Sequence, residues 1–79
     1  MKKTEFVEQI SEFCEFEGGP YTPETELQSI EGYDSMAVLS MIAFIDENFS
    51  VKLTGEQFIK LTDFNSLIAA IGADKFEDD

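Results

Sequence analysis

Positively charged residues are scarce in this chain, which has five lysines, no arginine and no histidine against seventeen aspartates and glutamates. The formal charge of -12 argues against nucleic-acid binding, because neutralising phosphates requires a basic surface. Without histidine, the usual serine–histidine catalytic pair is impossible within the chain. The lysines stand in polar contexts, where a lysine stays protonated and makes a poor base. We therefore expect no enzymatic activity.

Cysteines and long apolar segments are scarce as well. Cys14 is the single cysteine, so no internal disulfide can form, and this fits a reducing compartment. No apolar run approaches the roughly 20 residues that span a bilayer, and the start of the chain lacks the apolar segment of a signal peptide. We expect a cytoplasmic protein without membrane insertion. Neither zinc-ligand nor calcium-loop spacing is present, so we expect no metal site.

The apolar residues that are present suffice for a folded core. They make up 43% of the chain and include eight phenylalanines, more than a permanently disordered acidic chain carries. A length of 79 residues fits one small domain over residues 1–79, which we expect to be a monomer. The one-sided charge favours encounters with partners that carry positive patches.

The first half of the chain predicts two helices joined by a long loop. Apolar residues one helical turn apart follow Thr4, a potential cap, and "GGP" at residues 18–20 is expected to end this helix. The loop after it is long for a compact domain, which is typical of a functional segment. Asp34 is a good N-cap for a second helix that runs from Ser35 to about Phe49.

The second half predicts two shorter helices. A capping box of Thr54 with Gln57 marks the start of a short third helix. Asp63 can cap a fourth helix, whose apolar residues follow helical spacing up to a stop at Gly72. Residues 73–79 are expected to form a frayed acidic tail. The whole pattern predicts an all-α fold, a small four-helix bundle with a long first loop.

The pair Asp34–Ser35 has an ordinary interpretation and a functional one. Taken alone, the pair is a capping residue followed by a first-turn residue. It follows the long loop, however, and stands at the positive end of the least charged helix, where a phosphate attached to Ser35 would be favoured electrostatically. Ser35 is therefore a good position for a covalent attachment.

At these residues the sequence resembles the acyl carrier protein family, whose members carry Gly-x-Asp-Ser-Leu at the start of the second of four helices. Here the stretch is Gly32, Tyr33, Asp34, Ser35 and Met36. The resemblance extends to the helix layout, the length and the acidity. It implies a phosphopantetheine arm, joined to Ser35 by a phosphopantetheinyl transferase, whose thiol holds acyl groups as thioesters. Asp34 would serve as a motif residue and helix cap, and the implied partners include acyl-loading and acyl-transferring enzymes.

One departure from the family concerns the outward face of the second helix. Carriers of bulk fatty acid synthesis typically present several acidic residues there. A helical wheel with Val38, Ile42, Ile45 and Phe49 on the buried side predicts an outward face with little charge. This predicted partner-binding face consists of Met36, Ala37, Ser40, Phe44 and Glu47.

Two classes of function remain open from the sequence. The first is a discrete acyl carrier for a dedicated pathway, such as lipid or surface-polysaccharide acylation, a secondary metabolite or an aminoacyl intermediate. Within this class, a conventional carrier of fatty acid biosynthesis stays possible. The second is an unmodified acidic adaptor or inhibitor that uses the second helix for recognition without a cofactor.

Overall fold

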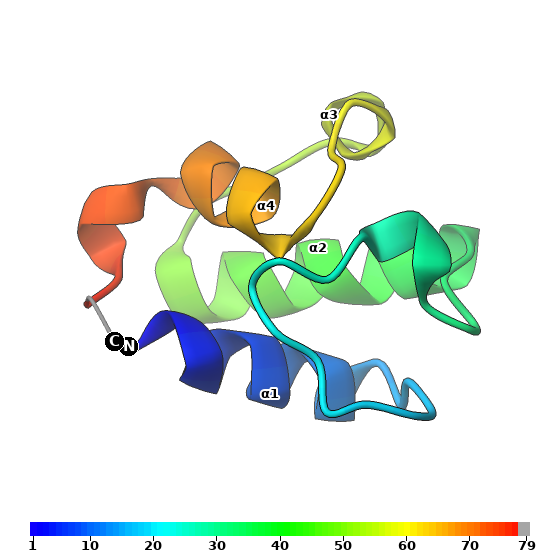
Figure 1. Ribbon diagram of the computed structural model, residues 1–79. Coiled ribbons are helices and arrows are strands. Elements are labelled where there is room, and N and C mark those ends of the chain that lie inside the picture. Colours follow the sequence, from blue (N-terminus) through cyan, green and yellow to red (C-terminus); the bar gives the residue numbers. More distant parts are fainter. Residues whose placement is uncertain (78–79) are drawn as a thin grey trace.

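The protein is all-α, as the sequence predicts. The computed structural model describes residues 1–77, and among them there is no β-strand (Figure 1). The four helices of this part are α1 (Lys3–Phe13), α2 (Ser35–Phe49), α3 (Gly55–Ile59) and α4 (Phe64–Ile71). Two short 3-10 turns, η1 (Leu27–Ser29) and η2 (Ala73–Lys75), complete it.

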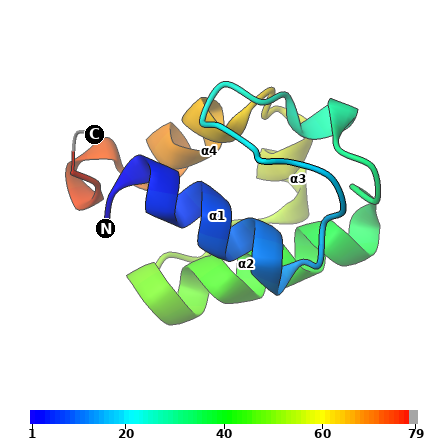
Figure 2. The ribbon, with the colours of Figure 1, turned by 60° about the horizontal axis from the view of Figure 1, so that its bottom comes forward.

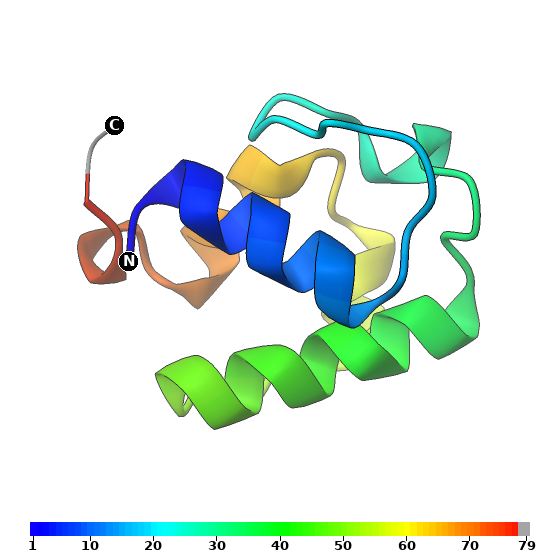
Figure 3. The ribbon, with the colours of Figure 1, turned by 90° about the horizontal axis from the view of Figure 1, so that it is seen from below.

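The long helices α1 and α2 pack against each other, and the first loop runs beside the start of α4 (Figures 1 and 2). From below, α1 crosses α2 at an angle rather than running parallel to it (Figure 3). The short helix α3 contacts α2 and lies over its N-terminal half. This arrangement places the start of α2 between the first loop and α3.

Phenylalanine rings fill the part of the core that surrounds Phe6. The Phe6 ring is fully buried, and its centroid lies 5.2 Å from that of Phe76, 5.8 Å from Phe49 and 6.1 Å from Phe44. Phe49 and Phe76 also contact each other, at 5.1 Å. Because buried rings carry large apolar surface and prefer tilted or edge-on contacts, this cluster joins α1, the C-terminal half of α2 and the end of the chain.

The first loop is long but firmly attached. Leu27 is fully buried, and its amide donates to the carbonyl oxygen of Thr62 at 2.9 Å. Farther back, the carbonyl oxygen of Pro23 accepts from the amide of Asn65 at 2.8 Å. These bonds fix the loop to the segment that starts α4, so the chain reaches α2 from a defined direction.

Two predicted helix ends require correction. Helix α1 begins at Lys3, with Thr4 inside its first turn, and the amide of Lys2 donates to the Glu5 carboxylate at 3.2 Å. The helix also ends at Phe13, before the predicted glycines, because Glu15 adopts the left-handed conformation with a φ of 57°. The predicted starts of α2, α3 and α4 are confirmed, each with its capping side chain bonded to the third amide of the helix.

The expectation of a frayed tail is wrong for residues 73–77. Ala73–Lys75 form η2, and Phe76 is only 8% exposed because its ring packs on Phe6 and Phe49. The amide of Glu77 donates to the carbonyl oxygen of Met1 at 3.0 Å. Residues 78 and 79, the rest of the predicted tail, lie outside the described residues.

Candidate functional site

Ser35 is the first residue of α2 and is exposed. The preceding residue, Asp34, has an extended backbone, and its Oδ1 accepts a hydrogen bond from the amide of Ala37 at 2.9 Å. This bond satisfies one of the amides that have no partner within the helix. The cap therefore sets where α2 begins, and it leaves Ser35 accessible at the positive end of a fifteen-residue helix.

The turn that leads into Ser35 is built on one buried side chain and one glycine. Ile30 is 4% exposed, and its carbonyl oxygen accepts from the amide of Tyr33 at 3.1 Å. Between them Gly32 has a φ of 91°, a conformation that side-chain-bearing residues rarely adopt. Tyr33 is half-buried, and this burial raises the pKa of its phenol. The chain is thus anchored up to the residue before Asp34.

A pocket of about 260 Å³ opens beside Ser35, between α2, α3 and η1. An added Cβ at Gly55, at the start of α3, would meet no atom within 4 Å, so the α3 side of the pocket is open. The pocket lining comprises Gln28, Tyr33, Asp34, Ser35, Val38, Gly55, Phe58 and Ile59. The serine hydroxyl therefore has free space next to it rather than a packed neighbour.

The predicted outward face of α2 is wrong for two of its five residues. Ala37 and Phe44 are each only 7% exposed, whereas Met36 is 70% exposed, Glu47 is exposed and Ser40 is half-buried. Phe44 points at α1, where its ring centroid lies 5.5 Å from that of Phe13 and 6.1 Å from that of Phe6. Neither buried residue is available to a partner in this structure.

The correction follows from how α1 packs on α2. The residues Ala37, Met41, Phe44 and Ile45 form the buried stripe, while Val38, Ile42 and Phe49 are only half-buried. Both sets follow helical spacing, and α2 is apolar on most sides, so its own sequence does not decide which stripe faces the core. The phenylalanines of α1 decide it through their contacts with Phe44.

Exposed apolar residues near Ser35 were not all predicted from the sequence. Leu39 is 61% exposed on α2, and Ile59 is 80% exposed on α3. Ala43 follows Leu39 one turn later and is exposed too. The sequence contained a usable signal for Ile59, because this residue lies outside the capping box of Thr54 and Gln57 that starts α3. Leu39 could be placed only after the buried stripe of α2 was known.

Cys14 is a packing residue next to the N-terminal part of α2. Its Sγ is 3.9 Å from the carbonyl oxygen of Ala37, and burial raises the pKa of the thiol to about 11. A thiol with so high a pKa carries little of the reactive thiolate near neutral pH. Cys14 therefore acts as a small, partly buried apolar residue.

An exposed hydroxyl at a helix N-terminus, with open space beside it, fits a residue that carries a phosphodiester. A family model described as the phosphopantetheine attachment site matches residues 4–71. This chain belongs to that family, the acyl carrier proteins. The carrier thus holds covalently bound phosphopantetheine and works with enzymes that modify it and handle its acyl groups. No curated protein and no solved structure was found to match it.

None of the helices within residues 1–77 is long and apolar enough to cross a membrane. In the same part of the chain, no three histidine, cysteine, aspartate or glutamate side chains gather in a way that could hold a metal ion.

Proposed function

We propose that Ser35 is the attachment residue and that the protein is a discrete acyl carrier for a dedicated pathway. The observation that carries this proposal is the exposed Ser35, at the capped start of α2 and beside a pocket. Asp34 supports it by fixing the first turn of the helix. Once bound, phosphopantetheine supplies the thiol on which an acyl group is held.

The modification itself needs little from the carrier. A phosphopantetheinyl transferase would join the Ser35 oxygen to the phosphorus of the phosphopantetheine part of coenzyme A. The bond from that phosphorus to the nucleotide part breaks, the adenosine bisphosphate leaves, and the serine proton passes to a base of the transferase or to water. The carrier presents the hydroxyl, and the helix dipole favours the phosphodiester that results.

The proposal of a dedicated pathway rests on the exposed residues that flank Ser35. Any enzyme that acts on the arm must approach this end of α2. The side chains it would meet are Met36 and Leu39 on α2 and Ile59 on α3, all of them apolar and highly exposed. Exposed apolar residues that gather in this way are typical of a binding surface. We call these three residues the apolar rim.

Charged residues of α2 lie farther from Ser35. Asp46 and Glu47 are near the C-terminal end of the helix, and Ser40 is the polar residue in between. Acidic residues at a docking surface mainly raise the rate of encounter with basic enzymes and discriminate among them. The apolar rim therefore favours partners whose docking surface is itself apolar rather than basic.

Mass spectrometry tests the attachment. The purified carrier is incubated with coenzyme A and several broad-specificity transferases, and we expect a mass gain of one phosphopantetheine. Ser35→Ala should abolish the gain and remain folded, whereas Ser29→Ala, which alters another exposed serine, should keep it. A wild-type protein that no transferase modifies would instead support the unmodified adaptor.

The partner preference has its own test. The modified carrier should accept malonyl groups slowly from a malonyl transferase of bulk fatty acid synthesis, and Leu39→Glu with Ala43→Glu should accelerate the transfer. The matched control is Ala69→Glu with Ala70→Glu, which adds the same charge at exposed positions of α4. If wild type already equals a conventional fatty acid carrier at low and moderate salt, the dedicated-pathway proposal is wrong.

A further inference from the structure

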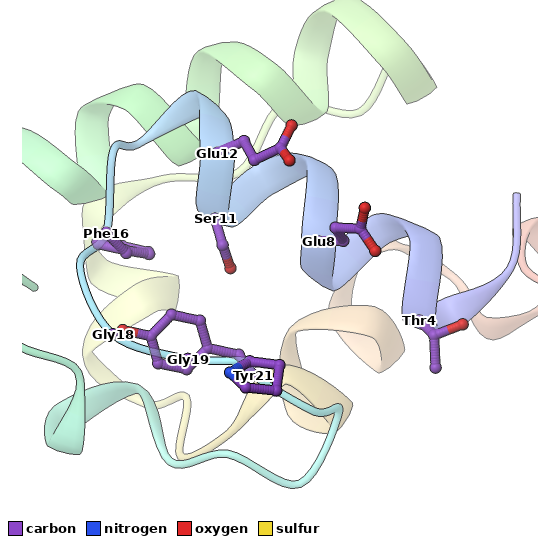
Figure 4. A pocket seen from close by; sticks show the side chains of 9 residues that line it. Thr4, Glu8, Ser11, Glu12, Phe16, Gly18, Gly19 and Tyr21 are labelled. Atoms are coloured by element: carbon purple, nitrogen blue, oxygen red, sulfur yellow. The ribbon is translucent and has the colours of Figure 1, made fainter.

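A second pocket, of about 330 Å³, lies between α1 and residues 16–21 of the first loop (Figure 4). It shares no lining residue with the pocket beside Ser35. Its lining includes Glu8, Ser11, Glu12, Phe16, Gly18 and Tyr21. The function proposed above makes no use of it.

Two aromatic rings form one end of this pocket. Phe16 and Tyr21 meet edge to face, with centroids 6.3 Å apart and planes at 80°. The Tyr21 hydroxyl donates to the carbonyl oxygen of Glu17, which holds the ring across the loop. Gly18 leaves room for this ring, because an added Cβ there would come within 3.3 Å of the Tyr21 oxygen. The two rings are therefore held in place and form one wall of the pocket.

The opposite side of the pocket presents oxygen atoms from α1. Ser11 is only 8% exposed, and its side chain points toward Tyr21 across the pocket (Figure 4). Its hydroxyl donates to the carbonyl oxygen of Val7 at 2.6 Å, so its lone pairs remain available to accept. Glu8 and Glu12 lie one helical turn apart along the rim and are exposed.

The carboxylates and the aromatic rings of this pocket together favour a cationic ligand. Carboxylates attract a positive charge, and the face of an aromatic ring does so as well. No lysine or arginine occurs between Lys3 and Lys52, so none of the residues that line the pocket is a cation. An anionic ligand would be repelled by the two carboxylates, and a purely apolar ligand would make no use of their charge.

We propose that this pocket binds an arginine side chain of a partner protein. A guanidinium is planar and can stack on an aromatic ring, while its five N–H donors form a fork that matches carboxylates. Both features are present here, with the Phe16–Tyr21 wall at one end and Glu8 and Glu12 at the rim. An ammonium group would gain the charge interaction but lose the stacking and the paired hydrogen bonds.

The pocket would act as a second contact for a partner, separate from the apolar rim. The proposal does not depend on the proposed function of Ser35, because the two pockets have no residue in common. Binding at the pocket should therefore be the same in wild type and in Ser35→Ala. This independence also lets each proposal fail without the other.

Nuclear magnetic resonance titration with small probes provides the test. The probe is N-acetyl-arginine amide, with the isosteric N-acetyl-citrulline amide as its uncharged control and N-acetyl-lysine amide as the competing cation. We expect saturable shifts of the amides of Gly18, Gly19 and Tyr21 with the arginine probe. The lysine probe should bind more weakly, and the citrulline probe should cause no saturable shift.

Variants identify the residues responsible. Glu8→Gln with Glu12→Gln should weaken arginine binding roughly five- to tenfold, the combined effect of two exposed charge pairs. The matched control is Glu24→Gln with Glu26→Gln, which removes the same charge from exposed loop positions outside the pocket. Equal weakening in both double variants would overturn the proposal, as would shifts spread evenly over all acidic residues or equal binding of the three probes.

Discussion

The two halves of α2 both carry large apolar residues, but these residues serve different purposes. At the C-terminal end, Phe44 is 7% exposed and Ile45 fully buried, among the rings around Phe6. At the N-terminal end, Met36 is 70% and Leu39 61% exposed, beside Ser35. The difference arises because α1 covers only one side of α2. One face of α2 thus holds the fold together, and the other face, most exposed near Ser35, is left free for partners.

The largest expected loss of stability is at the packed C-terminal end of α2. Phe6→Ala removes a fully buried ring that contacts three other phenylalanines, so it should lower the free energy of unfolding by about 3–5 kcal/mol. That loss is comparable to the whole stability of a small domain. Urea denaturation followed by circular dichroism measures it. A loss below about 1 kcal/mol would mean that this cluster is not the main core.

A smaller loss of stability is expected at the boundary between the first loop and α2. Asp34→Ala removes the cap of α2 and should cost about 1 kcal/mol of unfolding free energy. Asp34→Asn is the control, because an asparagine oxygen can accept the same bond from the amide of Ala37. The same denaturation experiment applies. Equal losses in the two variants would show that the charge of Asp34 matters more than its capping bond.

At the free end we expect almost no effect on stability and a clear effect on recognition. Leu39→Ala and Ile59→Ala should change the unfolding free energy by less than about 0.5 kcal/mol, because both side chains are mostly exposed.

Each of these two changes should nevertheless raise the KM of a phosphopantetheinyl transferase roughly fivefold, the equivalent of about 1 kcal/mol. Ala69→Gly on α4 is a distant control for the kinetics. An unchanged KM for both variants would mean that the apolar rim does not contact this enzyme.

The smallest effect concerns Cys14, which lies under the N-terminal half of α2. Burial raises the pKa of its thiol from 9.0 to about 11, so the folded state favours the neutral form. Its contribution to stability is therefore complete below about pH 9 and is lost as the pH rises toward 11. Melting temperatures over pH 8–11 should fall less steeply in Cys14→Ala than in wild type. Parallel curves would contradict this.

The helices that carry local signals could be predicted from the sequence. Asp34, Thr54 and Asp63 each cap a helix as their positions indicated, because capping depends on residues only a few positions apart. The same locality makes Ser35 a good candidate, since its position follows from the cap and from the loop before it.

The predictions that were wrong concern residues whose burial depends on contacts between segments far apart in the sequence. Helical spacing predicts Phe44 on the outward face of α2, and local composition predicts Phe76 in a frayed tail. Both side chains are instead buried against the Phe6 ring of α1. Neither helical periodicity nor local composition contains that information. The pocket of Phe16 and Tyr21 likewise depends on how the loop folds back on α1. Tertiary packing therefore decides the surfaces that partners meet, while local sequence decides where the helices begin.

The most direct test of the proposed role of Ser35, at the free end of α2, is to locate the modification by peptide mapping. The carrier is modified with coenzyme A and a transferase, digested, and sequenced by tandem mass spectrometry. We expect phosphopantetheine on Ser35 and on no other serine, with Ser40, about 1.4 turns along the same helix, as the internal control. Phosphopantetheine on a different residue, or on several serines at once, would contradict it.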